Sequence, residues 1–313
     1  AVVIIVLLFF FLGWFFFRKA FYRPAVKDLS DENVLLTSEL FGFTPTLKPA
    51  LQWFGKQKWE DISVTAGDGA ELHGLFLPRK EAKVCILMQH GYGSAPQDLC
   101  MTARWASERG YALLLPYMRA HGPSGGDYCA LGLLEAEDCQ RWIEKVRELL
   151  PGASLVLYGA DMGAFTALRT ATLPDTPDIT AVISEGTYTG PKEILRHVMK
   201  NQMRMRVFPL LQLLCLYGKL VWKRWPGGAD LRLTLKEKRT APVLFIHGRQ
   251  DYRVPCSMTE EVAKVCASYK VTFIAEDAGH AAAPLADSET YFGELEAFLD
   301  AVLANPPISP KTP

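Results

Sequence analysis

The chain opens with an uninterrupted apolar run. Residues 1–17 (AVVIIVLLFFFLGWFFF) carry no charged or polar side chain apart from the indole of Trp14. As a helix this run is about 26 Å long, and residues 18–22 extend it to the ~30 Å of a bilayer core. We therefore expect residues 1–24 to form a single-pass transmembrane anchor. A cleaved signal peptide and a buried helix are the alternatives; the run is longer than a usual signal core, and no A-x-A site follows.

Basic residues follow this run, at positions 18, 19, 23 and 27. By the positive-inside rule they favour a cytoplasmic location for the rest of the chain. Because the chain begins with Ala rather than Met, we expect further residues before it. Residues 25–58 are a mixed, proline-containing juxtamembrane segment in which we expect short helices.

From Trp59 onward, short apolar runs alternate with amphipathic stretches, which is typical of α/β folds. Gly67-Asp68-Gly69 predicts a hairpin turn between the first two strands. The later strands predict a mostly parallel sheet with helices on both faces. The expected strands are 59–65, 71–77, 84–88, 111–116, 155–158, 179–184, 243–246 and 271–275, and the expected helices are 97–109, 131–149, 257–268 and 288–303. The domain thus covers residues 59–304, and the proline-rich tail 305–313 is expected to be disordered.

One insertion interrupts the alternation, at about 190–230. It is too long for an ordinary connection, so we expect a small helical cap. Its apolar and aromatic residues lie among basic ones, which suits a membrane surface or an anionic, lipid-like ligand, or else a solvated basic face over an ordinary cap core. The basic residues are Lys192, Arg196, Lys200, Arg204, Arg206, Lys219, Lys223 and Arg224.

Composition narrows the function classes. The 313 residues are 49% hydrophobic and 22% charged, and 34 basic residues balance 34 acidic ones. This excludes a disordered chain and argues against nucleic-acid binding, which leaves a basic excess. The seven cysteines show no C-x-x-C spacing, so we expect no zinc site and no disulfide framework. No dinucleotide motif is complete either, because Gly91-x-Gly93 lacks its third glycine, and we expect no cofactor.

Three strand ends place reactive side chains at one edge of the predicted sheet. The strand at 155–158 runs into Gly159-Ala160-Asp161-Met162-Gly163, a spacing that allows a sharp turn with Asp161 raised above the sheet. Asp251 follows the strand at 243–246, and His280 follows the last strand. We therefore expect these three side chains to meet.

In these motifs the chain resembles the α/β-hydrolase superfamily, over roughly residues 59–304. It looks most like membrane-anchored bacterial members of the serine-hydrolase (esterase/peptidase-like) branch. The matching stretches are LMQHGYGSAPQDL, RAHGPSGG, LYGADMGAFTAL, FIHGRQDYRVP and DAGHA.

The resemblance implies roles for individual residues. His280 would be the general base and Asp251 its orienting acid, with Glu185 as an alternative acid. The oxyanion donors would be the backbone N–H groups of Tyr92 and Met162. His90, His121 and His247 would shape loops, whereas His73 and His197 match no motif and are interpreted as surface residues. Ser94 and Ser124 are better explained by turns than as displaced nucleophiles.

Asp161 is the departure from this pattern, because the esterase branch has Ser at the elbow. In one hypothesis Asp161 is a working nucleophile, as in the related haloalkane dehalogenases and epoxide hydrolases, for which leaving-group donors are needed. In a second, an esterase-type site has lost its nucleophile. In a third, the fold only binds ligands at a membrane. Cap candidates for substrate contact are Tyr188, Tyr217 and Trp222.

We therefore expect a membrane-anchored α/β hydrolase of the esterase or acyl-hydrolase type, with a lipophilic ester-like or lipid-like substrate. The sequence leaves the substrate and the oligomeric state open.

Overall fold

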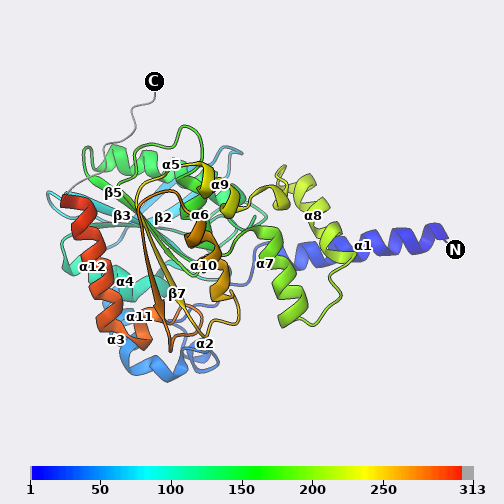
Figure 1. Cartoon of the computed structure of the whole chain (residues 1–313), viewed down its shortest axis with the longest axis horizontal. Coiled ribbons are helices and arrows are strands. Elements are labelled where there is room, and N and C mark those ends of the chain that lie inside the picture. The colour runs from blue at the N-terminus through cyan, green and yellow to red at the C-terminus, as the bar shows by residue number, and fades with distance from the viewer. Residues whose placement is uncertain (1, 305–313) are drawn as a thin grey trace.

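The structure is a computed structural model that describes residues 2–304, the side chains of residues 2, 5 and 6 excepted. The described residues form one eight-stranded sheet with the order β1-β2-β4-β3-β5-β6-β7-β8 (Figure 1). The pairs β1–β2 and β2–β4 are antiparallel and the other pairs are parallel, as the sequence predicts. The strands are β1 (Glu60–Thr65), β2 (Glu71–Leu77), β3 (Val84–Gln89), β4 (Ala112–Pro116), β5 (Ser154–Ala160), β6 (Ala181–Glu185), β7 (Val243–Gly248) and β8 (Lys270–Ala275).

Successive side chains of the central strands enter two different hydrophobic clusters. In β3, Cys85 and Leu87 belong to one cluster, whereas Ile86 and Met88 belong to the other. This is the period of two expected for a strand that is buried on both faces. Helices α5 (Leu133–Leu149), α6 (Met162–Thr170) and α10 (Cys256–Val265) cover the first face, and α3 (Thr44–Lys56), α4 (Cys100–Glu108), α11 (Ala283–Ala286) and α12 (Ser288–Ala304) cover the second (Figure 1).

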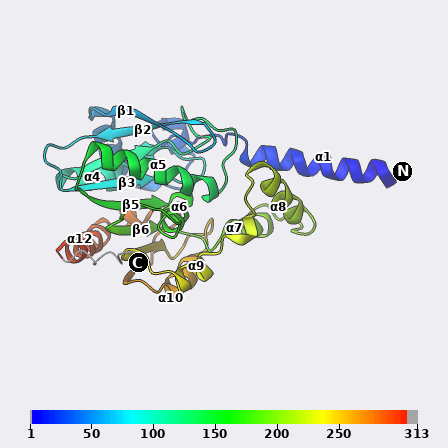
Figure 2. The ribbon, with the colours of Figure 1, turned by 90° about the horizontal axis from the view of Figure 1, so that it is seen from above.

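The insertion between β6 and β7 is helical. It contains α7 (Pro191–His197), a π-helical turn (Val198–Gln202) and α8 (Leu210–Val221), after which α9 (Leu231–Glu237) leads back to the sheet. Figures 1 and 2 both show α7 and α8 standing away from the sheet, beside the N-terminal helix α1 (Val2–Phe21). The helical nature of the insertion, which we call the cap segment (residues 190–230), is thus as expected.

The prediction of a membrane-spanning anchor over residues 1–24 is not supported. Among the helices formed by residues 2–304, none combines the length and the apolar character needed to cross a bilayer. The single-pass location inferred from that anchor loses its support as well.

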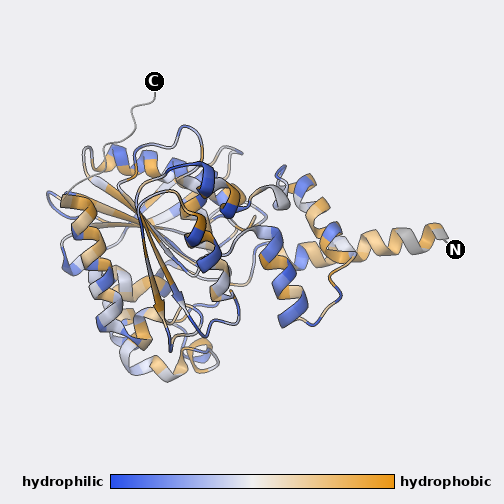
Figure 3. Ribbon diagram, in the orientation of Figure 1, coloured by the Kyte–Doolittle hydropathy of each residue, from blue (hydrophilic) through white to orange (hydrophobic). Residues whose placement is uncertain are grey.

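Helix α1 uses part of its apolar surface for packing within the chain. Phe17 and Phe21 are 0% and 1% exposed, and both rings contact Trp222 of the cap segment. Helices α1 and α8 meet at Gly13, so closely that a Cβ at this position would lie 2.0 Å from Leu213 Cδ2. Residues 3, 4 and 7–12 of α1 expose large apolar side chains, and the coloured part of this end of the helix is mainly hydrophobic in Figure 3.

The segment 25–58 forms two short α-helices, α2 (Glu32–Leu36) and α3, as predicted. The prediction of a disordered tail at 305–313 falls outside the described residues. The seven cysteines are free and buried.

Candidate active site

A sharp strand-to-helix turn carries Asp161. The residue lies between β5 and α6 with φ 54° and ψ −114°, a left-handed backbone that non-glycine residues rarely adopt. The flanking glycines make the turn possible, because a Cβ on Gly159 would lie 2.0 Å from the Gly163 carbonyl oxygen. A Cβ on Gly163 would lie 2.1 Å from the carbonyl oxygen of Gln89. The elbow predicted from glycine spacing is therefore present.

The Asp161 carboxylate contacts the backbone donor predicted for an oxyanion. Tyr92 lies in the loop after β3, and its N–H donates to Asp161 Oδ2 at 3.0 Å. A Cβ on Gly91 would be 2.9 Å from the same oxygen, so this loop lies directly against the carboxylate. Met162 is the first residue of α6, where a backbone N–H has no acceptor within its own helix. Of the two predicted donors, Tyr92 thus contacts the Asp161 carboxylate, and Met162 follows Asp161 directly in the chain.

Two histidines support the loop that carries Tyr92. His121 Nε2 accepts from the Gly93 N–H at 3.0 Å, and His90 Nε2 accepts from the Met118 N–H at 3.1 Å. Both rings are buried. These contacts agree with the loop-shaping role that the motifs imply.

His280 and Asp251 form a hydrogen-bonded pair. His280 Nδ1 lies 2.8 Å from Asp251 Oδ2, and the backbone N–H groups of Arg253 and Val254 donate to Asp251 Oδ1. Burial by itself would raise the pKa of Asp251, but the hydrogen bonds from His247 and His280 outweigh it and lower the pKa well below its usual range. Asp251 is therefore an ionised carboxylate that is hydrogen-bonded to the imidazole of His280.

The pKa of His280 is raised. Burial alone would lower it, but the hydrogen bond and charge of Asp251, together with the charge of Asp161, more than compensate. Both carboxylates thus stabilise the protonated ring.

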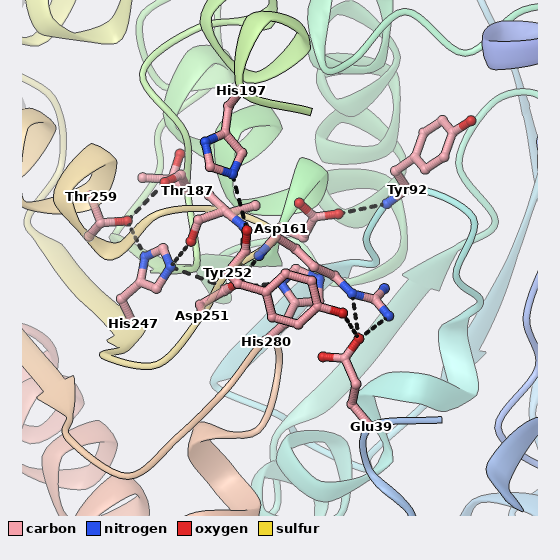
Figure 4. Close-up of polar contacts among 12 residues, drawn as sticks. Glu39, Tyr92, Asp161, Thr187, His197, His247, Asp251, Tyr252, Thr259 and His280 are labelled. Atoms are coloured by element: carbon pink, nitrogen blue, oxygen red, sulfur yellow. Dashed lines mark hydrogen bonds and ion pairs between the residues drawn. The ribbon is translucent and has the colours of Figure 1, made fainter. Parts of the chain in front are cut away.

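A second histidine lies behind this pair (Figure 4). His247 Nε2 is 2.9 Å from the Val254 carbonyl oxygen and 3.3 Å from Asp251 Oδ2, and His247 Nδ1 is 2.7 Å from Thr259 Oγ1. Thr259 in turn donates to the Thr187 carbonyl. His247 is fully enclosed, so it fixes the loop that carries Asp251.

The alternative acid, Glu185, has different partners. Its Oε2 accepts from the hydroxyls of Tyr158 at 2.6 Å and Tyr291 at 2.7 Å. Burial raises the pKa of Glu185 in spite of these two hydrogen bonds. The hydrogen-bond partner of His280 is Asp251, so the geometry assigns Glu185 to a buried link between β5, β6 and α12.

The two serines considered as displaced nucleophiles make hydrogen bonds that hold loops in place. Ser94 donates to Asp98 Oδ2 at 2.6 Å, and Ser124 donates to the Tyr117 carbonyl oxygen at 2.5 Å. The Ser94 contact is a local turn contact, as predicted. Ser124 also accepts a hydrogen bond from the His73 N–H at 2.9 Å, so it ties its loop to β2 rather than only closing a turn.

The three cap candidates lie in two different environments. Tyr188 lines the pocket above Asp161, stacks on Phe165 and donates its hydroxyl to the Leu131 carbonyl at 3.0 Å. Tyr217 donates to the Phe10 carbonyl oxygen at 2.8 Å. Trp222 is 2% exposed and packs on α1. Tyr217 and Trp222 therefore belong to the contact between α1 and the cap segment.

A pocket of about 700 Å³ opens over Asp161 and His280. Its walls come from α1, the loop after β3, the cap segment and the loop after β7. This volume is in the range of sites for small organic ligands. The mainly apolar lining includes Phe16, Ile194, Leu195, Met199, Leu210 and Leu214.

Several residues around the site could not be identified from the sequence. Arg253 lines the pocket and forms an ion pair with Glu39, which also accepts from the Tyr252 hydroxyl at 2.6 Å (Figure 4). His197, interpreted as a surface residue, bonds the Tyr252 carbonyl oxygen at 3.1 Å. These partners lie more than fifty residues apart in the sequence, and no local motif indicates that they interact.

Comparison with known proteins finds relatives of uncharacterised function. YqkD of Bacillus subtilis is 26% identical over 280 residues, which is 88% of this chain and 88% of YqkD. YfhR of Escherichia coli K12 is 24% identical over 236 residues, or 72% of this chain and 76% of YfhR. No protein-family profile matches the sequence.

Solved structures share the fold. Esterase Pf2001 of Pyrococcus furiosus superimposes with a TM-score of 0.62 at 19% identity, covering 82% of this chain and 95% of the esterase. Acylaminoacyl peptidase of Pyrococcus horikoshii gives 0.59 at 19% identity over 80% of this chain and 43% of the peptidase. The esterase EaEST of Exiguobacterium antarcticum gives 0.57 at 17% identity, over 77% of this chain and all of EaEST. With its strand order and elbow, the chain therefore has the α/β-hydrolase fold.

Proposed function

We propose that the protein has an acyl-hydrolase type of site for lipophilic ester, thioester or amide ligands, in which Asp161 replaces the nucleophile and limits turnover. The observation that carries this proposal is the 3.0 Å hydrogen bond from the Tyr92 N–H to Asp161 Oδ2. The His280–Asp251 pair and the mainly apolar pocket beside Asp161 also support it. The donor that should stabilise the substrate oxyanion is occupied by the protein's own carboxylate.

The chemistry follows from that occupation. Serine-type hydrolysis places the substrate carbonyl oxygen on the backbone donors, which stabilise it as an oxyanion in the transition state. Here that position holds a negative charge. Attack of Asp161 on an ester carbonyl would also give an anhydride, an unfavourable intermediate. The chain as it stands is therefore expected to bind acyl ligands and to hydrolyse them slowly or not at all.

Restoring a hydroxyl tests the proposal. Asp161→Ser should gain activity on p-nitrophenyl esters of increasing chain length, by at least about 10²-fold over the Asp161 protein. Asp161→Asn is the matched control, since it removes the charge and supplies no nucleophile. Adding His280→Ala to Asp161→Ser should abolish the gain. A folded Asp161→Ser protein without esterase activity would reject the proposal in favour of a non-catalytic binding protein.

A carboxylate nucleophile is the second candidate, and the same hydrogen bond favours it. With Oδ2 on a backbone donor, the other oxygen could attack an sp³ carbon and expel a halide or alkoxide. The resulting ester carbonyl oxygen would already lie on the donor. Alkylation would remove the Asp161 charge, so His280 could release its proton, activate water and complete the hydrolysis. The two cap tyrosines that could donate a proton to such a leaving group, Tyr188 and Tyr217, however, give their hydroxyl hydrogens to backbone carbonyls.

Isotope labelling separates the two candidates. Single-turnover reactions with haloalkanes or epoxides in ¹⁸O-water should label the Asp161 peptide if its carboxylate is the nucleophile. Active substrates without label at Asp161 would exclude the carboxylate mechanism.

A further inference from the structure

The N-terminal segment (α1 and residues 22–27) forms one wall of the pocket over Asp161. Phe16, Ala20 and Phe21 of α1 face the pocket, as do Leu195 and Met199 of the cap segment. Ligand space thus lies between two elements almost two hundred residues apart. The apolar side chains on both walls suit a flexible hydrocarbon chain.

One tyrosine joins this wall to the carboxylate. The Tyr92 hydroxyl donates to the Ala20 carbonyl, while its backbone N–H donates to Asp161 Oδ2. The backbone N–H of Lys27 also donates to the Gly93 carbonyl at 2.9 Å. These contacts fix the N-terminal segment against the loop beside Asp161, so the pocket runs continuously from Asp161 to α1.

The same segment brings uncompensated positive charge to the pocket. Lys19 and Lys27 both line it and are exposed. Within residues 2–304, the lysines that form ion pairs with carboxylates are Lys48 and Lys145. A third cation, Arg253, lines the pocket as well but is paired with Glu39. Lys19 and Lys27 are therefore available to a ligand.

We propose that the pocket takes a single-chain amphiphile with an anionic head group, which Lys19 and Lys27 recognise while the chain lies between α1 and the cap segment. This inference rests on the proposed function and names the class of its ligand. Asp161 repels an anion, so the head group belongs at the lysines and the ester linkage near Tyr92. A monoacyl ester whose alcohol part carries a negative charge meets all three requirements.

Binding of matched amphiphiles tests this proposal without any turnover. The probes are monododecyl phosphate, dodecyl maltoside and dodecyltrimethylammonium, which share a chain and differ in head-group charge. Isothermal titration of the full chain, with Asp161 intact and probes below their micellar concentrations, should show at least about fivefold tighter binding of the phosphate. Monobutyl phosphate should bind far more weakly, because it lacks the chain. Equal affinity for the three dodecyl probes would overturn the proposal.

Charge variants locate the head-group site. The double variant Lys19→Gln/Lys27→Gln should lose the preference for the phosphate. Lys236→Gln/Lys264→Gln is the matched control, because it removes the same charge from exposed positions outside the pocket lining. Equal loss in both double variants would show general charge attraction and reject the site. The comparison of probes on the unmodified chain decides the question even if a variant folds poorly.

The two proposals can fail separately. If Asp161→Ser hydrolyses neutral p-nitrophenyl esters but the chain shows no anionic preference, only this inference is wrong. If the chain prefers the phosphate but Asp161→Ser stays inactive, the ligand class stands and the hydrolase assignment falls.

Discussion

The negative charge of Asp161 lies on the backbone donor of Tyr92, where the oxyanion of a bound ester would otherwise form. The Tyr92 N–H donates to a carboxylate oxygen of Asp161, and the charge of this carboxylate adds to the larger effect of Asp251 in raising the pKa of His280. In the unliganded site, the Tyr92 donor therefore already has a negatively charged acceptor. An acyl ligand has to displace this carboxylate from its donor or bind beside it.

The charge of Asp161 should be visible in the titration of His280. Asp161→Asn keeps the shape and an acceptor oxygen but removes the charge, so we expect the pKa of His280 to fall relative to the unmodified chain. The Asp251 interaction remains, which limits the fall. NMR titration of the His280 ring, assigned with His280→Gln, measures the change. An identical pKa in both proteins would show that Asp161 does not act on His280.

The same shift has a consequence for stability. A pKa raised above its ordinary value of 6.5 stabilises the fold below that pH. This contribution disappears as the pH rises through the folded-state pKa. The unmodified chain should therefore lose more unfolding free energy than Asp161→Asn between pH 6 and pH 9, as chemical denaturation can measure.

The elbow should tolerate no side chain at Gly163. In Gly163→Ala, the new Cβ would collide with the Gln89 carbonyl oxygen at 2.1 Å, a backbone atom that cannot rotate away. We expect a loss of about 2 kcal/mol or more in unfolding free energy, measured by urea denaturation. Gly55→Ala in α3 is the control, since nothing lies within 4 Å of its Cβ position. It should be neutral or slightly stabilising, and similar losses at both positions would contradict the steric argument.

At the scale of elements, the C-terminal half of α1 has a buried face and an exposed face. Phe17 is 0% exposed in the hydrophobic cluster, whereas Phe15 is 52% exposed on the same helix. Phe17→Ala should cost about 3–5 kcal/mol of unfolding free energy. Phe15→Ala, which deletes the same atoms, should change it by less than about 0.5 kcal/mol. Urea denaturation of both variants compares them, and equal losses would show that α1 does not pack as described.

Elements were more predictable than their partners. The strands β3, β5 and β7 could be located because short apolar runs ended by Gly or His mark them, and glycine spacing alone indicated the elbow at Asp161. The environment of α1 could not be predicted, because hydropathy is the same for a helix that enters lipid and for one that packs on Trp222. The choice of Asp251 over Glu185 came from the motif around Asp251, and the geometry has His280 bonded to Asp251.

At the scale of the whole molecule, the sheet separates two hydrophobic clusters. One contains Phe17, Phe21 and Trp222 with the helices α5 and α6. The other contains Leu47 and Phe54 of α3. Helix α1 and the cap segment therefore share a cluster, which lies across the sheet from α3. Local openings of α1 and α8 should be coupled to each other.

Hydrogen exchange can measure this coupling. In Phe17→Ala, the backbone amides of α8 should exchange faster than in the unmodified chain, because α8 loses the aromatic surface on which it packs. The amides of α3 should change less, since they lie in the other cluster. Mass spectrometry of peptides from both helices gives the comparison. Equal acceleration in α3 and α8 would indicate global rather than local opening.

The two hydrogen bonds of Tyr92 link the N-terminal helix α1 directly to the Asp161 carboxylate. The Tyr92 amide is hydrogen-bonded to the Asp161 carboxylate, and the Tyr92 hydroxyl is hydrogen-bonded to the backbone of α1. A movement of the loop that carries Tyr92 would therefore also pull on α1. A ligand that displaces the Asp161 carboxylate from the Tyr92 amide would thus shift α1, whose N-terminal end has exposed apolar side chains. Occupancy of the pocket would be communicated to whatever surrounds that exposed end.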